Sequence, residues 1–172
     1  MFAAKSPGDW HGWVNANEKS RIDVLENGRP VLIRQVAQTD RAREHALVQR
    51  WSPASRHAFL LGQQHELREG QACIALVHEN GRLIEIGASR YAAMGEYQFE
   101  CAVTVAAAWK RLGLGTLLME HLIDAARKNG VHLMYSVGAS SNAPLRDLAR
   151  FLGFEAHDDP FDPHKVIHRL YL

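Results

Sequence analysis

The chain has 172 residues, of which 47% are hydrophobic and 23% are charged, with 20 Lys and Arg against 19 Asp and Glu. This length suits one domain, and the composition is not that of a disordered, collagenous or coiled-coil protein. A formal net charge of +1 argues against a dedicated nucleic-acid or membrane-surface binder, which would need a basic excess. No apolar stretch has the length of a membrane span or the form of a signal peptide, so we expect a cytoplasmic protein.

The first fifty residues predict an irregular segment, a hairpin and a helix. Residues 1–20 mix Pro, Gly, Asn and Trp without periodicity. Apolar runs at 22–25 and 31–36 flank the turn pair Asn27-Gly28, which favours a hairpin. Thr39-Asp40 can cap a helix with apolar residues at helical spacing, and a Ser-Pro pair would end it near residue 52.

The middle of the chain predicts a second hairpin and a further strand. Apolar runs at 72–78 and 83–91 flank Asn80-Gly81, a stronger hairpin signal than the first. In the next strand, at 97–105, the side chains should alternate between two faces. One face would carry Phe99, Cys101, Val103 and Val105, and the other Glu100, Ala102 and Thr104.

The two cysteines of the chain lack zinc or redox spacing, so we expect reduced thiols.

The second half alternates helices and strands. A helix with one apolar stripe is predicted at 114–129, followed by a strand at 131–137, a helix at 142–152 and a closing strand at 166–172. Hairpins followed by this alternation indicate an α+β fold with a mixed sheet, in one domain from residue 21 to 172. A possible metal cluster does not match any zinc spacing, so we expect no metal site: its members would be His157, His164, His168, Asp158, Asp159 and Asp162.

The segment 103–116 has the character of an anion site. It reads as a strand, a short loop with Gly113 and Gly115, and the start of the long helix. Glycines let a ligand approach the backbone closely, and a helix N-terminus adds partial positive charge. Lys110 and Arg111 add two cations, which suits a diphosphate. The glycine pair has a second interpretation, because such pairs also end strands or ease close packing.

This segment resembles the acetyl-CoA motif of the GNAT superfamily of N-acetyltransferases, Gln/Arg-x-x-Gly-x-Gly/Ala. It stands here as Lys110-Arg111-Leu112-Gly113-Leu114-Gly115, with Lys where Gln or Arg is usual. Residues 142–154 are similar to the family's Asn-led helix that ends in Gly-Phe, and the resemblance extends from Ile22 to Leu172. It implies the GNAT fold: a central, mixed, mostly antiparallel sheet of about six to seven strands, flanked by helices and splayed at the family's strands 4 and 5.

The resemblance implies that acetyl-CoA binds here as a cosubstrate. The family's contacts fall on the strand end, the loop, the helix start and the Asn-led helix: Val103, Thr104, Val105, Lys110, Arg111, Leu112, Gly113, Leu114, Gly115, Thr116 and Asn142. The strand end would pair with the amides of the pantetheine arm as an added strand would. Asn142 has a second available role as the N-cap of its helix.

The resemblance also places the family's catalytic glutamate at Glu100, as the general base that takes a proton from the amine. From the residues alone, an outward-facing glutamate on a half-exposed strand is the alternative. Many family members use a tyrosine on the last helix to protonate the leaving thiolate. The corresponding residue here is Ala149, so no general acid is assigned.

Within the superfamily the chain is most similar to the acetyltransferase domain of bacterial protein lysine acetyltransferases that act on acyl-CoA synthetases. The similar pieces are Pro30–Arg34, Ser52–Arg56, Ser89–Tyr91, and Glu100 nine residues before Trp109. The resemblance implies a protein lysine as acceptor, such as one on an acyl-CoA synthetase. A small amine (polyamine, aminoglycoside or amino acid) and a non-catalytic acetyl-CoA sensor are the alternatives. We expect a monomer or homodimer, without a fused regulatory domain.

Overall fold

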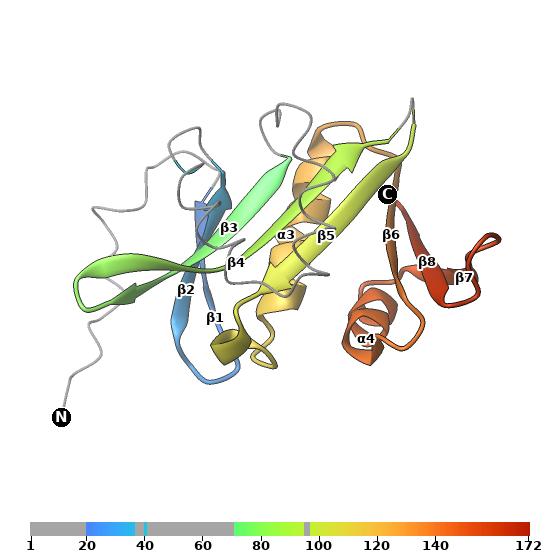
Figure 1. The fold of residues 1–172 in the computed structure, drawn as a ribbon. Helices are drawn as coiled ribbons and strands as arrows, with labels where there is room; N and C mark the ends of the chain where they lie inside the picture. The colour runs from blue at the N-terminus through green and yellow to red at the C-terminus, as the bar shows by residue number, and fades with distance from the viewer. Residues whose placement is uncertain (1–19, 37–39, 41–70, 95–96) are drawn as a thin grey trace.

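The computed structural model describes residues 20–36, 40, 71–94 and 97–172 (Figure 1). The strands are β1 (Ser20–Val24), β2 (Pro30–Gln35), β3 (Ala72–Glu79), β4 (Arg82–Ala93), β5 (Phe99–Val105), β6 (Leu133–Ala139), β7 (Glu155–Asp158) and β8 (Lys165–Tyr171). The helices are the short 3₁₀ helix η3 (Ala107–Trp109) and the α-helices α3 (Leu114–Lys128) and α4 (Ala143–Phe151). The predicted irregular segment and the predicted helix after Thr39 lie outside the described residues, apart from Ser20 and Asp40.

Both predicted hairpins are confirmed. β1 pairs antiparallel with β2 across a turn in which Gly28 has a φ of 80°. β3 pairs antiparallel with β4 across Asn80 and Gly81, whose φ values are 49° and 78°. Glycine and asparagine adopt a positive φ most readily, so these turn pairs determine where each strand reverses.

The described strands form one eight-stranded sheet in the order β1-β2-β3-β4-β5-β6-β8-β7. Its pairs are antiparallel except β5 with β6, so the sheet is mixed and mostly antiparallel, and the predicted α+β class is confirmed. Eight strands are one more than the expected six to seven. The unexpected one is β7, an edge strand of sequence Glu-Ala-His-Asp whose four residues are all exposed. These residues carry no strand signal in the sequence. They form a strand because they pair with β8.

β5 and β6 separate along most of their length. β5 pairs with β4 throughout but with β6 only at Phe99↔Met134 and Glu100↔Tyr135. Beyond these two pairs the strands diverge, and the gap widens toward η3 and α4 (Figure 1). This is the splay that the resemblance implied, and it leaves one side of Val103–Val105 without a neighbouring strand among the described residues.

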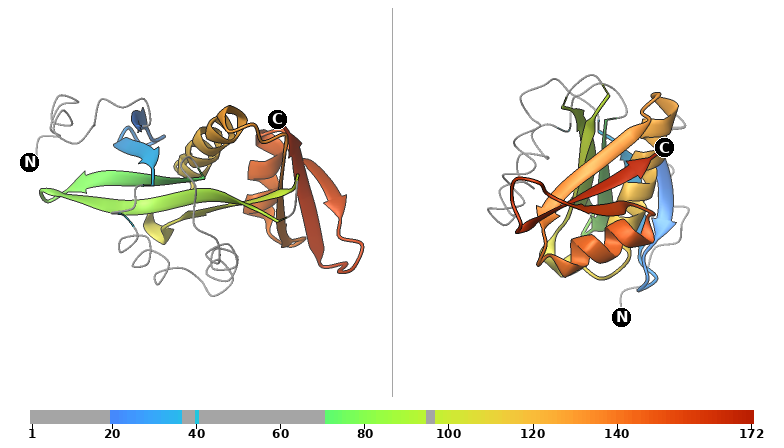
Figure 2. Two further views of the ribbon diagram at one scale, coloured as in Figure 1. Left: turned by 90° about the horizontal axis from the view of Figure 1, so that it is seen from above. Right: turned by 90° about the vertical axis from the view of Figure 1, so that its right-hand side faces the viewer.

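α3 lies along one face of the sheet and packs against β3, β4 and β5 (Figure 2). The larger apolar cluster forms between them and includes Cys101, Leu118, Leu122 and Met134. A smaller cluster on the opposite face contains Leu32, Ile74, Leu76 and Ala88. The predicted alternation along β5 is confirmed, since Phe99, Cys101, Val103 and Val105 belong to the α3 side. Glu100 therefore lies on the opposite face.

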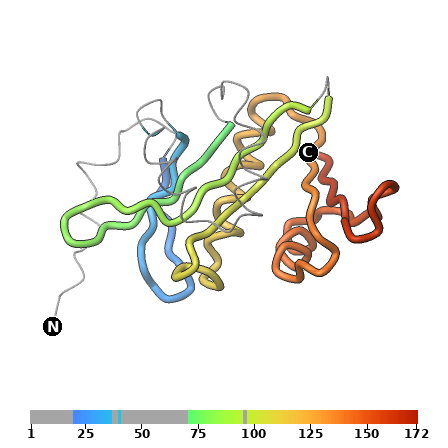
Figure 3. The backbone as a smooth tube through the Cα atoms, in the orientation of Figure 1, coloured from blue at the N-terminus to red at the C-terminus, as the bar shows by residue number. Residues whose placement is uncertain are grey.

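The two described α-helices agree with their predicted spans to within a residue at each end. α3 is followed by Gly130, whose φ of 75° fits the predicted C-terminal stop. α4 is capped by Asn142, whose Oδ1 accepts a hydrogen bond of 3.2 Å from the Leu145 N–H. The chain then returns through β7 and β8 and ends beside the start of β6, where the Leu172 N–H donates to the His132 carbonyl (Figure 3). None of the described helices is long and apolar enough to cross a membrane.

Candidate functional site

The loop between η3 and α3 presents a helix N-terminus without a side-chain cap. Gly113 is the N-cap residue and has a φ of 79°. It has no side chain, so it cannot form a side-chain capping hydrogen bond. Arg111, two residues earlier, also has a positive φ of 60°. The first turn of α3 contains no acidic residue. Because the first N–H groups of a helix lack intrahelical partners, this end of α3 can bind an anion through its backbone.

The two glycines of the loop are needed for different reasons. Gly113 has a backbone conformation that other residues adopt only with strain. At Gly115, an added Cβ would lie 3.7 Å from Leu148 Cδ2 and 3.9 Å from Val105 Cγ2, which are ordinary contacts. Packing among the described residues therefore does not demand glycine at 115. This favours close approach of a ligand over close packing as the role of the second glycine.

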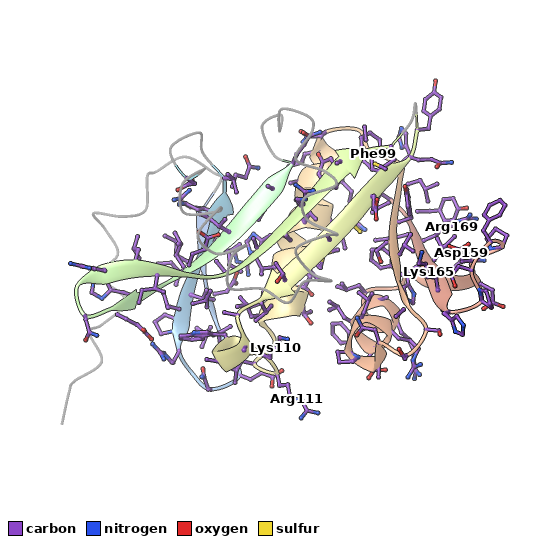
Figure 4. The ribbon with its side chains drawn as sticks, viewed as in Figure 1. Phe99, Lys110, Arg111, Asp159, Lys165 and Arg169 are labelled. Carbon is purple, nitrogen blue, oxygen red and sulfur yellow. The ribbon has the colours of Figure 1, made fainter. Side chains whose placement is uncertain are left out.

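The cationic side chains predicted for this loop lie at its surface. Lys110 and Arg111 are both exposed, and Arg111 extends away from the ribbon near the start of α3 (Figure 4). One carboxylate lies there as well: Glu26 Oε1 is 3.3 Å from the position that a Cβ of Gly113 would take. The loop thus combines an uncapped helix N-terminus with two exposed cations and one competing acid.

The β1–β2 turn holds this loop in place, which the sequence did not indicate. The Glu26 N–H donates a 3.2 Å hydrogen bond to the Leu112 carbonyl. The Arg29 guanidinium lies 4.3 Å from the centre of the Trp109 ring, and it also forms a 2.8 Å ion pair with Glu79. Residues so far apart in the chain carry no shared motif, so only the fold brings them together.

The opening between β5 and β6 contains a largely apolar pocket beside α3 and α4. It is lined by Cys101, Ala102, Val103, Met119, Ser136, Leu145, Leu148, Ala149, Leu152 and Phe154. Of the predicted binding residues, the structure places Val103 in this lining, and Thr104 and Val105 continue the same strand toward η3 and the start of α3. Asn142 is exposed at the start of α4, outside this lining, and its side-chain oxygen is used as the helix cap.

Glu100 lies at the narrow end of the opening, on the face opposite α3. Its side chain is half-buried, and its neighbour across the parallel pair is Tyr135. Burial raises the pKa of Glu100 above its ordinary value, while the positive charge of Arg90 acts in the opposite direction. Arg90 is only 3% exposed, which makes it a fixed charge beside the carboxylate. A half-buried carboxylate of this kind is a stronger base than a fully exposed one.

Other reactive groups near Glu100 are less suited to proton transfer. Burial raises the pKa of Cys101 to about 12, and its side chain lies on the α3 side of β5. Ala149 is 4% exposed and presents only a methyl group to the pocket. In the part of the chain that the structure describes, no group of three or more His, Cys, Asp or Glu side chains is arranged to hold a metal ion.

Comparison with known proteins agrees with this geometry. The model of the family described as acetyltransferase (GNAT) family matches residues 36–154. Acetyltransferase PA5475 of Pseudomonas aeruginosa is 46% identical over 165 residues, which cover 88% of this chain and 89% of that protein. Among solved structures, the GNAT domain of S. lividans PAT has a TM-score of 0.73 at 17% identity and covers 98% of this chain and 100% of its own. The structure of yncA from Salmonella typhimurium with acetyl-CoA has a TM-score of 0.61 at 22% identity, covering 83% and 94%.

Proposed function

This chain belongs to the acetyltransferase (GNAT) family, and from that premise we propose that it transfers an acetyl group from acetyl-CoA directly to a primary amine, with Glu100 as general base and a protein lysine as acceptor. The observation that carries the proposal is the position of Glu100. It is a half-buried carboxylate at the narrow end of the β5–β6 opening, whose wide end faces the uncapped N-terminus of α3. Acetyl-CoA is a long molecule with a thioester at one end and a diphosphate further along. The base would lie near the thioester, and the N-terminus of α3 would bind the diphosphate.

The residues present fit acetyl-CoA. The backbone of Gly113–Thr116 would hold the diphosphate, with Lys110 and Arg111 adding charge. The free side of Val103–Val105 would accept the amides of the pantetheine arm, as an edge strand accepts a peptide. Asn142 keeps its cap role and would reach the same arm only with its amide nitrogen. When bound, acetyl-CoA supplies an activated thioester.

Glu100 addresses the main barrier, which is the protonation of the amine. A lysine amine with a pKa of about 10.4 must lose its proton, which at pH 7 costs about 4.6 kcal/mol. Burial raises the pKa of Glu100, so its carboxylate takes this proton more readily than an exposed glutamate would. The positive charge of Arg90 opposes that rise and favours the ionised carboxylate, which is the form that accepts a proton.

The choice of a protein lysine as acceptor is supported by the resemblance to bacterial protein lysine acetyltransferases in sequence. It is also compatible with the solved neighbours, since two of them are named as ribosomal-protein-alanine N-acetyltransferases and so act on protein amines. Acyl-CoA synthetases are the first proteins to test. A small-molecule amine is the competing acceptor, and a screen of acetyl-CoA consumption over free amines and lysine peptides separates the two.

The variant Glu100→Gln tests the role of the base. Because it removes the proton acceptor and keeps the shape, turnover should fall by about 100-fold or more, while acetyl-CoA should still raise the melting temperature. Glu120→Gln, an exposed change on α3, is the matched control and should keep full activity. Unchanged turnover of Glu100→Gln on every accepted amine would show that Glu100 is not the base. Failure of acetyl-CoA to stabilise the wild-type protein would overturn the proposed function itself.

A further inference from the structure

Two side chains, Glu100 and Tyr135, stand at the narrow end of the β5–β6 opening. They form the last pair between the parallel strands before these diverge (Figure 1). The preceding pair, Phe99 and Met134, belongs to the α3 side, so Glu100 and Tyr135 both lie on the opposite face. Neighbouring strands are about 4.8 Å apart, so the two side chains start from adjacent positions on the same face of the sheet.

The environment keeps the Tyr135 hydroxyl protonated. Its side chain is half-buried, and burial raises its pKa above the ordinary value. The negative charge of Glu100 raises this pKa further, which indicates that the two groups are close enough to interact. Within the described ranges, neither side chain makes a hydrogen bond to another residue. Both are therefore available to a ligand.

The proposed reaction needs a base for the amine and a proton donor for the leaving sulfur, close to each other. Glu100 must lie within hydrogen-bond reach of the attacking amine, directly or through one water. The amine nitrogen must touch the acetyl carbon, and the leaving sulfur is bonded to that carbon. Tyr135 pairs with Glu100 across the two strands, so we expect its hydroxyl to reach the centre where sulfur departs.

Other proton donors near the opening are less suitable. Cys101 and Ser136 line the pocket on the α3 side, away from Glu100. Burial raises the pKa of the Cys101 thiol to about 12, and this thiol lies on the face of β5 opposite to Glu100. Ala149, where related enzymes have a tyrosine, offers no proton. Among the described residues of β5 and β6, Tyr135 alone carries a hydroxyl and pairs directly with the base across the two strands.

We propose that Tyr135 is the general acid of this site and that Glu100 restores its proton; the inference rests on the proposed function. The amine nitrogen forms a bond to the acetyl carbon and releases a proton to Glu100. The carbon–sulfur bond breaks, its electron pair goes to sulfur, and sulfur takes the Tyr135 proton. Glu100 then passes the proton it received to the phenolate, which is the stronger base. The products are the acetylated amine and the CoA thiol, with both residues back in their starting states.

The test uses Tyr135→Phe, which removes the hydroxyl and keeps the ring. The control is Tyr171→Phe, a change of an exposed tyrosine on β8. CoA is the probe, and the thiol of bound CoA is titrated by thiolate absorbance as the difference between complex and free protein. A hydroxyl that donates to sulfur stabilises the thiolate, so Tyr135→Phe should raise the titration midpoint by about one pH unit, and the control should not.

A second measurement uses acetyl-CoA with the amine that the screen identifies. Tyr135→Phe should lower kcat by about 10-fold to 100-fold with little change in the KM for acetyl-CoA. Tyr135→His keeps a proton donor at the same place and should recover part of this loss. The two Tyr135 variants must melt like the wild type for the comparison to count, and the thiol titration provides a readout that does not need turnover.

An unchanged titration midpoint or an unchanged kcat in Tyr135→Phe overturns the assignment of Tyr135. These outcomes are distinct from failure of the proposed function. If the wild type binds CoA but acetylates no amine, the proposed function fails, and the thiol titration still decides whether Tyr135 contacts sulfur. If the wild type does not bind CoA, both proposals are overturned.

Discussion

Gly113 determines how α3 begins. Its φ of 79° turns the chain from the loop into the helix, and the N-terminus of α3 has no side-chain cap. A residue with a Cβ would pay about 1–2 kcal/mol for this conformation. Gly115, by contrast, has an ordinary backbone and room for a methyl group. The first glycine is thus a requirement of the backbone, and the second is best explained by a ligand.

Gly113→Ala should weaken acetyl-CoA binding as well as stability. The strain of about 1–2 kcal/mol should be relieved by moving the loop, which would displace the N–H groups that we propose bind the diphosphate, so the Kd should rise about tenfold. Gly130→Ala is the matched control at the other end of the same helix, with a φ of 75° and open space around it. It should lose similar stability but keep the wild-type Kd in a calorimetric titration. Equal affinity of both variants for acetyl-CoA would contradict an anion site at Gly113.

Arg90 should set the pH range in which Glu100 acts. Its positive charge lowers the pKa of Glu100 against the effect of burial. In Arg90→Gln that pKa should rise, and the acidic limb of the pH profile of kcat/KM should move to higher pH. Arg90→Lys keeps the charge and should move the limb less. An acidic limb at the same pH in all three proteins would mean that it belongs to a group other than Glu100.

At the scale of elements, α3 can lie close to the sheet because one strand position has no side chain. A Cβ at Gly87 on β4 would lie 2.9 Å from Leu118 Cδ1 and 3.0 Å from the Thr104 carbonyl oxygen. Next to it, the Ser89 hydroxyl donates a 2.9 Å hydrogen bond to the Leu118 carbonyl. These contacts fix the height and direction of α3 over β4 and β5. They therefore also fix the position of its N-terminus relative to the β5–β6 opening.

Gly87→Ala should destabilise the protein by about 1–3 kcal/mol, because the added methyl group forces α3 or β5 to shift. Gly115→Ala, which adds the same methyl group where there is space, should leave stability unchanged or raise it by up to about 1 kcal/mol. Urea denaturation of the two variants measures both changes. A Gly87→Ala protein as stable as the wild type would mean that α3 is not held at this distance.

Over the whole molecule, the sheet joins two parts that perform different tasks. β1 to β5 with α3 form one wall of the opening, while β6 to β8 with α4 form the other (Figures 1 and 2). The second part is joined to the first through two residue pairs of β5 and β6 and through apolar side chains such as Met134, Ala149 and Phe154, which belong to the larger core. His168 on β8 is 4% exposed, and burial lowers its pKa, with Arg146 on α4 acting in the same direction.

Stability should fall as the solution is acidified through the pH range below 6.5. The pKa of His168 is lower in the folded state than in the unfolded chain, so the unfolded chain binds more protons there and is favoured by acid. Above this range the effect vanishes, because His168 is neutral in both states. His168→Gln should lose less melting temperature than the wild type between pH 7.5 and about 5.5. His164→Gln, an exposed control, should behave like the wild type, and identical losses in all three proteins would contradict the prediction.

Much of the fold was predictable because the sequence carries local signals for it. The turn pairs Asn27-Gly28 and Asn80-Gly81, the apolar stripe of α3 and the cap at Asn142 each act within a few residues, and the structure has all four. β7 was missed because its exposed, charged residues have no strand signal of their own. The helix predicted after Thr39 lies outside the described residues, and its prediction stands untested.

The sequence alone indicated the family and two parts of the candidate site, because a glycine loop at a helix start and a glutamate on the preceding strand are close in the chain. It did not determine how these residues meet. Only the tertiary structure placed Tyr135 beside Glu100, Arg90 near that carboxylate, and the β1–β2 turn against the loop before α3. The physical reason is that pairing across a sheet and burial depend on residues distant in sequence, and these decide the distances and pKa values on which catalysis depends.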